Sequence, residues 1–160
     1  MTVYTVSKSG GAHRLTDAGG NQVAALRAHW SMRGGEIETA EGRFPIWTDR
    51  GYQSVTVGPR EAPLVVLDGR GARIAGLSAP ARWELRGDRR RYDAVLSAGG
   101  SRIEVHQSAR MGADVRAEVT GAWPRPELVV LAACFGVMSV RRGHNLRALA
   151  VVGAISHGPR

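Results

Sequence analysis

A glutamate and a histidine two residues apart are the side chains best placed to do acid–base chemistry. They stand in the stretch Ile103-Glu104-Val105-His106, where apolar and polar residues alternate. If this stretch is a β-strand, Glu104 and His106 share one face and lie about 7 Å apart along it. Such a pair can transfer protons if it lines a pocket. The same alternation is typical of the solvated outer face of a sheet, where glutamate is ordinarily exposed, and this interpretation is favoured.

The common catalytic motifs are missing from the sequence. It has no G-x-S-x-G nucleophile turn and no phosphate-binding G-x-x-x-x-G-K-[ST] loop, and no cysteine and histidine stand at zinc-site spacing. The single cysteine, Cys134, lies in an apolar segment, so we expect a buried and inert thiol. These observations predict neither a cofactor nor a metal ion, and they favour a protein that is not an enzyme.

Arginine dominates the charge of the chain. Of its 22 basic residues all but Lys8 are arginine, and the formal net charge is +8. Six arginines form two clusters, one around the Gly87-Asp88 turn and one after the longest apolar segment: Arg86, Arg89, Arg90 and Arg91, then Arg141 and Arg142. Guanidinium clusters can bind phosphate or carboxylate, and they are also typical of solvated loops and helix ends. We expect these six residues to hold the partner if that partner is anionic.

The first three quarters of the chain predict a β-structure. Apolar residues from about residue 3 to 122 recur mostly at every second position, and glycine pairs such as Gly34-Gly35 and Gly99-Gly100 separate the segments. Short alternating strands without intervening helical patterns are typical of an antiparallel sandwich or barrel.

An internal repeat supports that interpretation. The segment Asp17–Leu26 matches Asp68–Leu77 in its Asp, Gly, β-branched, Ala and Leu positions, and Leu96–Ile103 is a fainter third copy. Each copy has the form strand, turn, strand, in which the aspartate caps the turn and the glycine takes a positive φ angle. The repeat therefore predicts a duplicated set of hairpins.

One apolar helix is predicted over residues 127–141. Pro126 and Glu127 precede the run Leu128–Met138, and Arg141-Arg142-Gly143 follows it, which are helix start and stop signals. Because its valines also suit a buried strand, that alternative stays open. A helix that is apolar on every face must be buried all round. We therefore predict a closed antiparallel β-barrel of about twelve short strands around this helix.

The rest of the chain is expected to belong to the same domain, which spans residues 1–160. The tail 143–160 contains a second apolar stretch, Leu146 to Ile155, and its last residues, Gly158 to Arg160, are expected to be frayed. The run Leu128–Met138 is too short to span a bilayer, and the N-terminus lacks the basic and apolar regions of a secretory signal.

These features together resemble the tubby C-terminal-like fold, in particular its LURP-one-related and phospholipid-scramblase branch. The resemblance covers roughly Tyr4 to Gly143 and is carried by the hairpins Asp17–Leu26 and Asp68–Leu77, by Arg91-Tyr92-Asp93 and by Leu128–Met138. It implies a barrel closed around a hydrophobic helix. The cysteine clusters and calcium-linked segment of the scramblases are not visible, so lipid scrambling is not carried over.

The expected function is therefore that of a non-catalytic binding or scaffold domain of the tubby or LURP-one-like type. Its partner would be anionic lipid headgroups or an acidic protein, in the cytoplasm or at the periphery of a membrane. Specific nucleic-acid binding is not expected, because the tryptophans are scattered and rarely adjoin arginine. The alternative is a small biosynthetic enzyme, of the cyclase or isomerase type, with a pocket at the barrel mouth. Glu104 and His106 would then be tested first.

Overall fold

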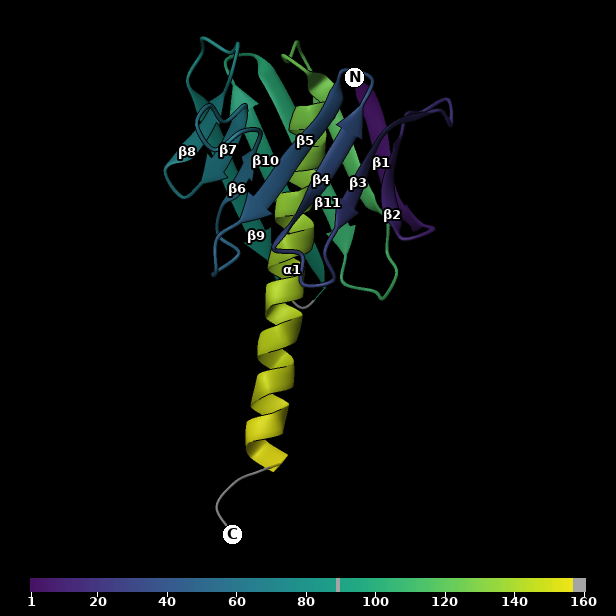
Figure 1. Ribbon diagram of the computed structural model, residues 1–160, viewed down its shortest axis with the longest axis vertical. Coiled ribbons are helices and arrows are strands. Elements are labelled where there is room, and N and C mark those ends of the chain that lie inside the picture. Colours follow the sequence, from purple (N-terminus) through teal and green to yellow (C-terminus); the bar gives the residue numbers. More distant parts are fainter. Residues whose placement is uncertain (89, 157–160) are drawn as a thin grey trace.

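Twelve antiparallel strands form a closed barrel, as the sequence predicts (Figure 1). The computed structural model describes residues 1–88 and 90–156, and beyond Asn145 it describes the backbone alone. The strands are β1 (Thr2–Ser9), β2 (Ala12–Thr16), β3 (Gln22–Ala28), β4 (Gly34–Thr39), β5 (Gly42–Thr48), β6 (Val55–Val57), β7 (Val65–Asp68), β8 (Gly71–Ile74), β9 (Ala81–Gly87), β10 (Arg91–Ala98), β11 (Ser101–Ser108) and β12 (Val115–Thr120).

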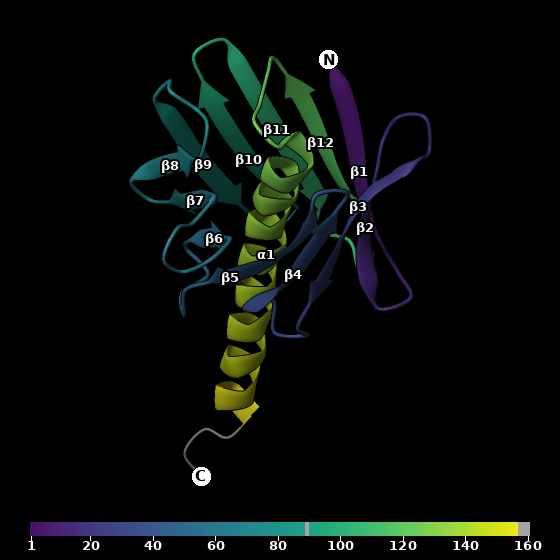
Figure 2. The same ribbon diagram turned by 45° about the horizontal axis from the view of Figure 1, so that its top comes forward.

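The strands follow one another around the barrel in chain order. Each pairs with its neighbours in the sequence, and β1 closes the barrel on β12, with Thr2 opposite Val119. Loops therefore alternate between the two ends of the barrel. The single helix α1 (Pro126–Ser156) begins at one end, runs through the interior and leaves at the other (Figures 1 and 2). The loops after odd-numbered strands lie at this second end, which we call the helix-exit end.

Alternation along the strands separates the core from the outer wall. In β10 the residues Tyr92, Ala94, Leu96 and Ala98 are buried, and the residues between them are partly exposed. In β11 Ile103 and Val105 face inward, so Glu104 and His106 face outward. The outer-face interpretation of that pair is therefore correct.

The helix fills the interior of the barrel. Every residue from 128 to 140 is buried, and the predicted apolar helix is confirmed over the predicted strand alternative. Cys134 is fully buried, and burial raises the pKa of its thiol to about 12, so this residue is the inert core cysteine that the sequence predicts. Among the described residues no helix is long and apolar enough to cross a bilayer.

The predicted end of the helix, near residue 141, is wrong. The helix continues to Ser156, and its last turn contains no basic residue. Gly143 is inside the helix, where a Cβ atom would come within 2.9 Å of Cδ2 of Tyr52. This glycine therefore allows close packing against Tyr52 and does not cap a terminus. Arg141 and Arg142 lie where the helix leaves the barrel. Arg89 and the segment Gly158–Arg160, which was expected to be frayed, are outside the described residues.

The repeated segments form hairpins with the predicted turn chemistry. Asp17 accepts hydrogen bonds from the backbone of Gly19 and Asn21, and Asp68 accepts one from Arg70. Gly20 has a φ of 82° and Gly71 one of 129°. The first hairpin joins β2 to β3 and the second joins β7 to β8. They consequently point to opposite ends of the barrel.

Candidate functional site

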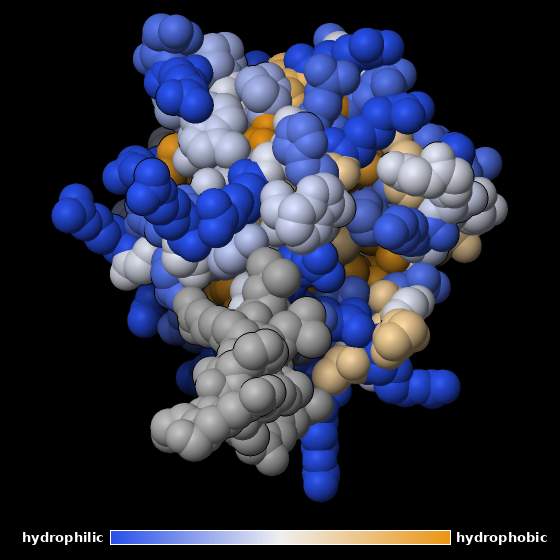
Figure 3. All heavy atoms as spheres, turned by 60° about the horizontal axis from the view of Figure 1, so that its bottom comes forward, coloured by the Kyte–Doolittle hydropathy of each residue, from blue (hydrophilic) through white to orange (hydrophobic). Residues whose placement is uncertain are grey.

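The two ends of the barrel carry opposite charge. At the helix-exit end, the described loops and the helix residues up to Asn145 contain seven arginines and three aspartates: Arg33, Arg50, Arg70, Arg90, Arg110, Arg141 and Arg142, against Asp49, Asp88 and Asp114. At the opposite end the loops and the first helical turn contain Arg60 and Arg125 against Asp17, Glu41, Glu61 and Glu127. Figure 3 shows the helix-exit end, with hydrophilic side chains over most of the visible surface. The excess positive charge of the helix-exit end attracts anions.

Two large apolar side chains are exposed at the same end. Trp30, in the loop after β3, is 77% exposed, and Met111, in the loop after β11, is 99% exposed. From this end α1 continues outward (Figure 1), through a sequence, Leu146 to Ile155, that is mostly apolar. The helix-exit end therefore combines positive charge with exposed apolar groups.

A cavity of about 280 Å³ opens between the helix and the barrel wall at this end. It is lined by residues from β1, β2, β11, the helix and two loops: Lys8, His13, Met32, Gln107, Gly112, Met138, Arg141, Arg142 and Asn145. Three of these side chains are cationic and none is a carboxylate. We call this site the mouth cavity.

Three buried polar atoms in the described part of the protein have no hydrogen-bond partner there, and all three belong to residues of the mouth cavity. They are Nδ1 of His13, Oε1 of Gln107 and Nε of Arg142. Gln107 is only 6% exposed, and its Nε2 donates to the carbonyl of Ala113, which leaves Oε1 as the unpaired acceptor. A buried polar atom without a partner costs about 1–3 kcal/mol, so a ligand that pairs with these atoms gains affinity here.

Two arginines of the mouth cavity are held in place by the loops. Nη2 of Arg141 donates to the carbonyls of Ala109 and Arg110, at 3.2 and 2.6 Å. The guanidinium of Arg142 lies over the ring of Trp30, 5.3 Å from its centroid. Burial, aided by the charge of Lys8, lowers the pKa of His13 below its usual value. The cavity therefore holds fixed cations beside an imidazole that favours its neutral form.

The six arginines predicted to bind an anion do not form one site. Arg141 and Arg142 line the mouth cavity. Arg86 and Arg91 face a hollow of about 340 Å³ on the outer wall, where Arg91 pairs with Asp93 at 2.6 Å. Arg90 lies in the turn after β9. The turn itself is organised by Asp88, whose pKa is lowered by hydrogen bonds from the backbone of Arg90 and Arg91.

The sequence predicts only Arg141 and Arg142 as site residues among those that line the mouth cavity. Three of the others are Lys8, His13 and Gln107. They belong to β1, β2 and β11, and β11 is nearly a hundred residues from the other two along the chain. Strand closure and the position of the helix bring them together, so local sequence gave no signal for these three residues.

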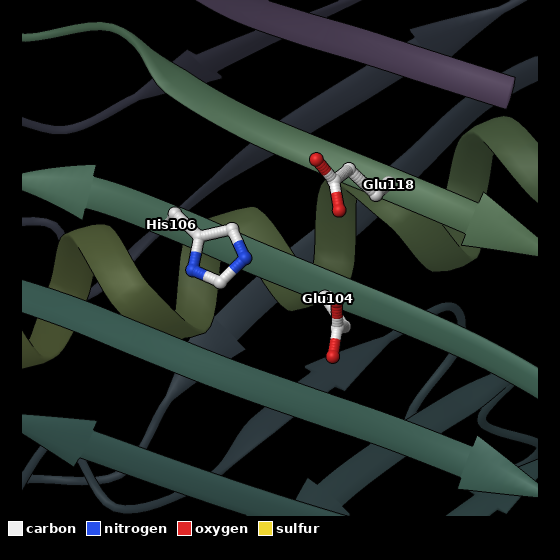
Figure 4. A group of neighbouring side chains, drawn as sticks. All are labelled: Glu104, His106 and Glu118. Atoms are coloured by element: carbon white, nitrogen blue, oxygen red, sulfur yellow. The ribbon is translucent and has the colours of Figure 1, made fainter.

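On the outer wall, Glu104 and His106 are joined by a third side chain, Glu118 of β12 (Figure 4). Glu118 stands directly opposite Glu104 in the register of β11 and β12, and one ligand atom of each residue lies within 4.8 Å of the others. Nδ1 of His106 is 2.6 Å from Oδ1 of Asp93 on β10. Burial alone would raise the pKa of Asp93, but the hydrogen bonds from His106 and Arg91 lower it below its usual value. Asp93 is thus an anion that holds His106.

Comparison with known proteins gave no match: no family model, no curated protein and no solved structure matches this chain. The site is therefore interpreted from its own geometry and charge.

Proposed function

We propose that the protein is a non-catalytic binding domain whose helix-exit end contacts anionic phospholipid headgroups. The observation that carries the proposal is the mouth cavity, which is lined by Lys8, Arg141 and Arg142 and contains three unpaired buried polar atoms. Arginine and lysine donate to phosphate oxygens, and the unpaired acceptor of Gln107 suits a headgroup hydroxyl. The surrounding arginines add long-range attraction to a negative surface.

The exposed apolar groups favour a membrane over an acidic protein. Tryptophan prefers the interface between water and lipid, where Trp30 would lie if the helix-exit end faced the bilayer. Met111 and the apolar part of the helix leave the barrel at the same end. We propose reversible attachment to the surface of a cytoplasmic leaflet, because arginines near such a leaflet gain about 1 kcal/mol each.

The resemblance to the tubby C-terminal-like fold supports a binding role. The family fold is a barrel closed around a hydrophobic helix, and this chain has the same architecture. A filled barrel leaves little interior volume for a substrate, so ligands are expected at the rim. We propose membership of that fold family on these grounds.

Liposome co-sedimentation tests the attachment, with neutral and anionic vesicles at two salt concentrations. The wild-type protein is expected to sediment with anionic vesicles alone, and less at high salt, because salt screens exposed charges. Replacing Arg50, Arg90 and Arg110 by alanine should lower partitioning roughly a hundredfold at low salt. The charge-matched control replaces Arg43, Arg82 and Arg102, which lie toward the opposite end, and should bind more tightly than the test variant. Equal losses in both variants would show that only total charge matters.

The variant Gln107→Met tests the mouth cavity without changing the charge. It removes the unpaired acceptor while keeping the length of the side chain. The expected result is weaker binding of anionic vesicles and of soluble glycerol 3-phosphate, at an unchanged salt dependence. If the variant binds both like wild type, the cavity has no part in the attachment. Binding of an acidic protein but of neither probe would replace the membrane by a protein partner.

A small cyclase or isomerase is the second candidate, and one observation favours it. The mouth cavity contains a titratable residue, His13, that favours its neutral form and has an unpaired ring nitrogen. No carboxylate, serine or cysteine is among the described residues that line the cavity, so Lys8 is the other lining side chain that could act as an acid, a base or a nucleophile. Glu104 and His106 lie on the outer wall, away from this mouth. An activity lost in His13→Gln and kept in His106→Gln would establish the enzyme.

A further inference from the structure

The outer wall carries a second arrangement of ligand-type side chains, which the proposed function does not use. Glu104 and His106 project from β11, and Glu118 projects from β12 beside them (Figure 4). All three are partly buried, with side-chain exposures of 33%, 41% and 27%. One imidazole and two carboxylates on rigid strands form a ligand set that suits a first-row divalent cation such as Zn²⁺ or Mn²⁺.

The register of the strands brings the two carboxylates face to face. Glu104 and Glu118 are directly opposed across β11 and β12. Like charges in directly opposed positions destabilise a sheet, and neighbouring cations offset this repulsion. Arg102 and Arg116 pair with Oε1 of Glu104 and of Glu118, at 2.8 and 3.2 Å. Neither ion pair uses Oε2, so each glutamate keeps one oxygen for a second cation.

His106 is oriented by a partner outside the three ligands. Oδ1 of Asp93 lies 2.6 Å from Nδ1 of His106, and Oδ2 of Asp93 lies 2.6 Å from Nε of Arg91. An ionised carboxylate can only accept, so Asp93 fixes the hydrogen of His106 on Nδ1, and in the neutral imidazole the lone pair is then on Nε2. Metal-binding histidines commonly donate their other ring nitrogen to a carboxylate, which fixes the tautomer and strengthens the ligand. Here Asp93 on β10 accepts from His106 on β11, and the two glutamates lie on β11 and β12.

We infer that Glu104, His106 and Glu118 form a binding site for a divalent transition-metal ion, with Asp93 as the positioning residue of His106. Metal–ligand distances of about 2.1 Å require the three ligand atoms to approach one another by small rotations of the glutamate side chains. Three protein ligands leave further coordination positions to water, since the site is open to solvent. The site is independent of the mouth cavity, because the two share no residue.

Calorimetric titration of the full chain with Zn²⁺ tests the site. A parallel titration with Co²⁺ is followed by the visible absorption of the bound ion. The wild-type protein is expected to bind one ion with micromolar affinity. His106→Gln and Glu118→Gln should each abolish the saturable phase. Asp93→Asn should weaken binding about 10- to 100-fold, while Asp93→Glu restores part of it.

The matched control is Glu38→Gln, which removes a glutamate that pairs with Arg43 elsewhere on the outer wall and should leave zinc binding unchanged. Melting curves without metal check that each variant folds. Zinc should raise the melting temperature of the wild type and not that of His106→Gln, since only a folded site binds the ion. Equal zinc binding by the wild type and His106→Gln overturns the inference, as does the lack of saturable binding at about 1 mM zinc.

Discussion

The hydroxyl of Tyr92 lies 3.2 Å from Nδ1 of His144, and their rings are 5.5 Å apart. Tyr92 belongs to the barrel wall at β10, and His144 belongs to the helix at the point where it leaves the barrel. The contact therefore ties the wall to the helix next to the mouth cavity. Burial raises the pKa of Tyr92, so its hydroxyl keeps its proton in the neutral range.

The variant Tyr92→Phe should lower the free energy of unfolding by about 0.5–1.5 kcal/mol, the usual net value of one such hydrogen bond. Denaturant titration measures this loss. The control is Tyr4→Phe, since Tyr4 is also buried and its hydroxyl has no hydrogen-bond partner among the described residues. A loss of the same size in both variants would mean that the contact with His144 contributes nothing.

The substitution Gly136→Ala should destabilise the barrel. A Cβ atom at this position in the helix would come within 2.9 Å of Cζ2 of Trp83 and 3.4 Å of Val55. Overpacking of this kind costs about 1–3 kcal/mol, and the better helix propensity of alanine recovers at most about 1 kcal/mol. Thermal unfolding measures the change. Gly100→Ala, where a Cβ meets nothing within 4 Å, should unfold like wild type.

Cys134 should resist alkylation in the native protein. The residue is fully buried, and its thiol, with a pKa of about 12, is protonated at neutral pH. Since the thiolate is the reactive species, iodoacetamide should label it only when the barrel unfolds. Mass spectrometry with and without denaturant distinguishes the two states. Rapid labelling of the native protein would mean that the helix leaves the barrel readily.

Protonation of His13 should destabilise the fold. Burial depresses its pKa in the folded state below the ordinary value of 6.5, so the unfolded chain binds the proton more tightly. The free energy of unfolding should therefore decrease as the pH falls below about 6.5, until the pKa of the folded state is passed. The variant His13→Gln should lack this part of the pH dependence. An identical pH profile for the variant and the wild type would contradict the expected shift.

The sequence by itself determined the architecture and the contents of the core. Alternating apolar and polar residues and Asp–Gly turns predicted the strands, because successive side chains of a strand point to opposite faces of the sheet, here the core and the solvent. A helix without a polar face, Leu128–Met138, could be stable in water only if the strands enclosed it. The buried Cys134 and the outward position of Glu104 and His106 followed from the same patterns.

Tertiary structure decided the length of the helix and the composition of both sites. Gly143 follows basic residues and looks like a helix cap, but the helix continues through it and packs closely against Tyr52 there. The mouth cavity joins Lys8 to Gln107, and the outer wall joins Glu118 to Glu104. The local sequence determines the periodicity of a single segment. Contacts between different strands, such as these two, depend on barrel closure and strand register, which are determined by the whole chain.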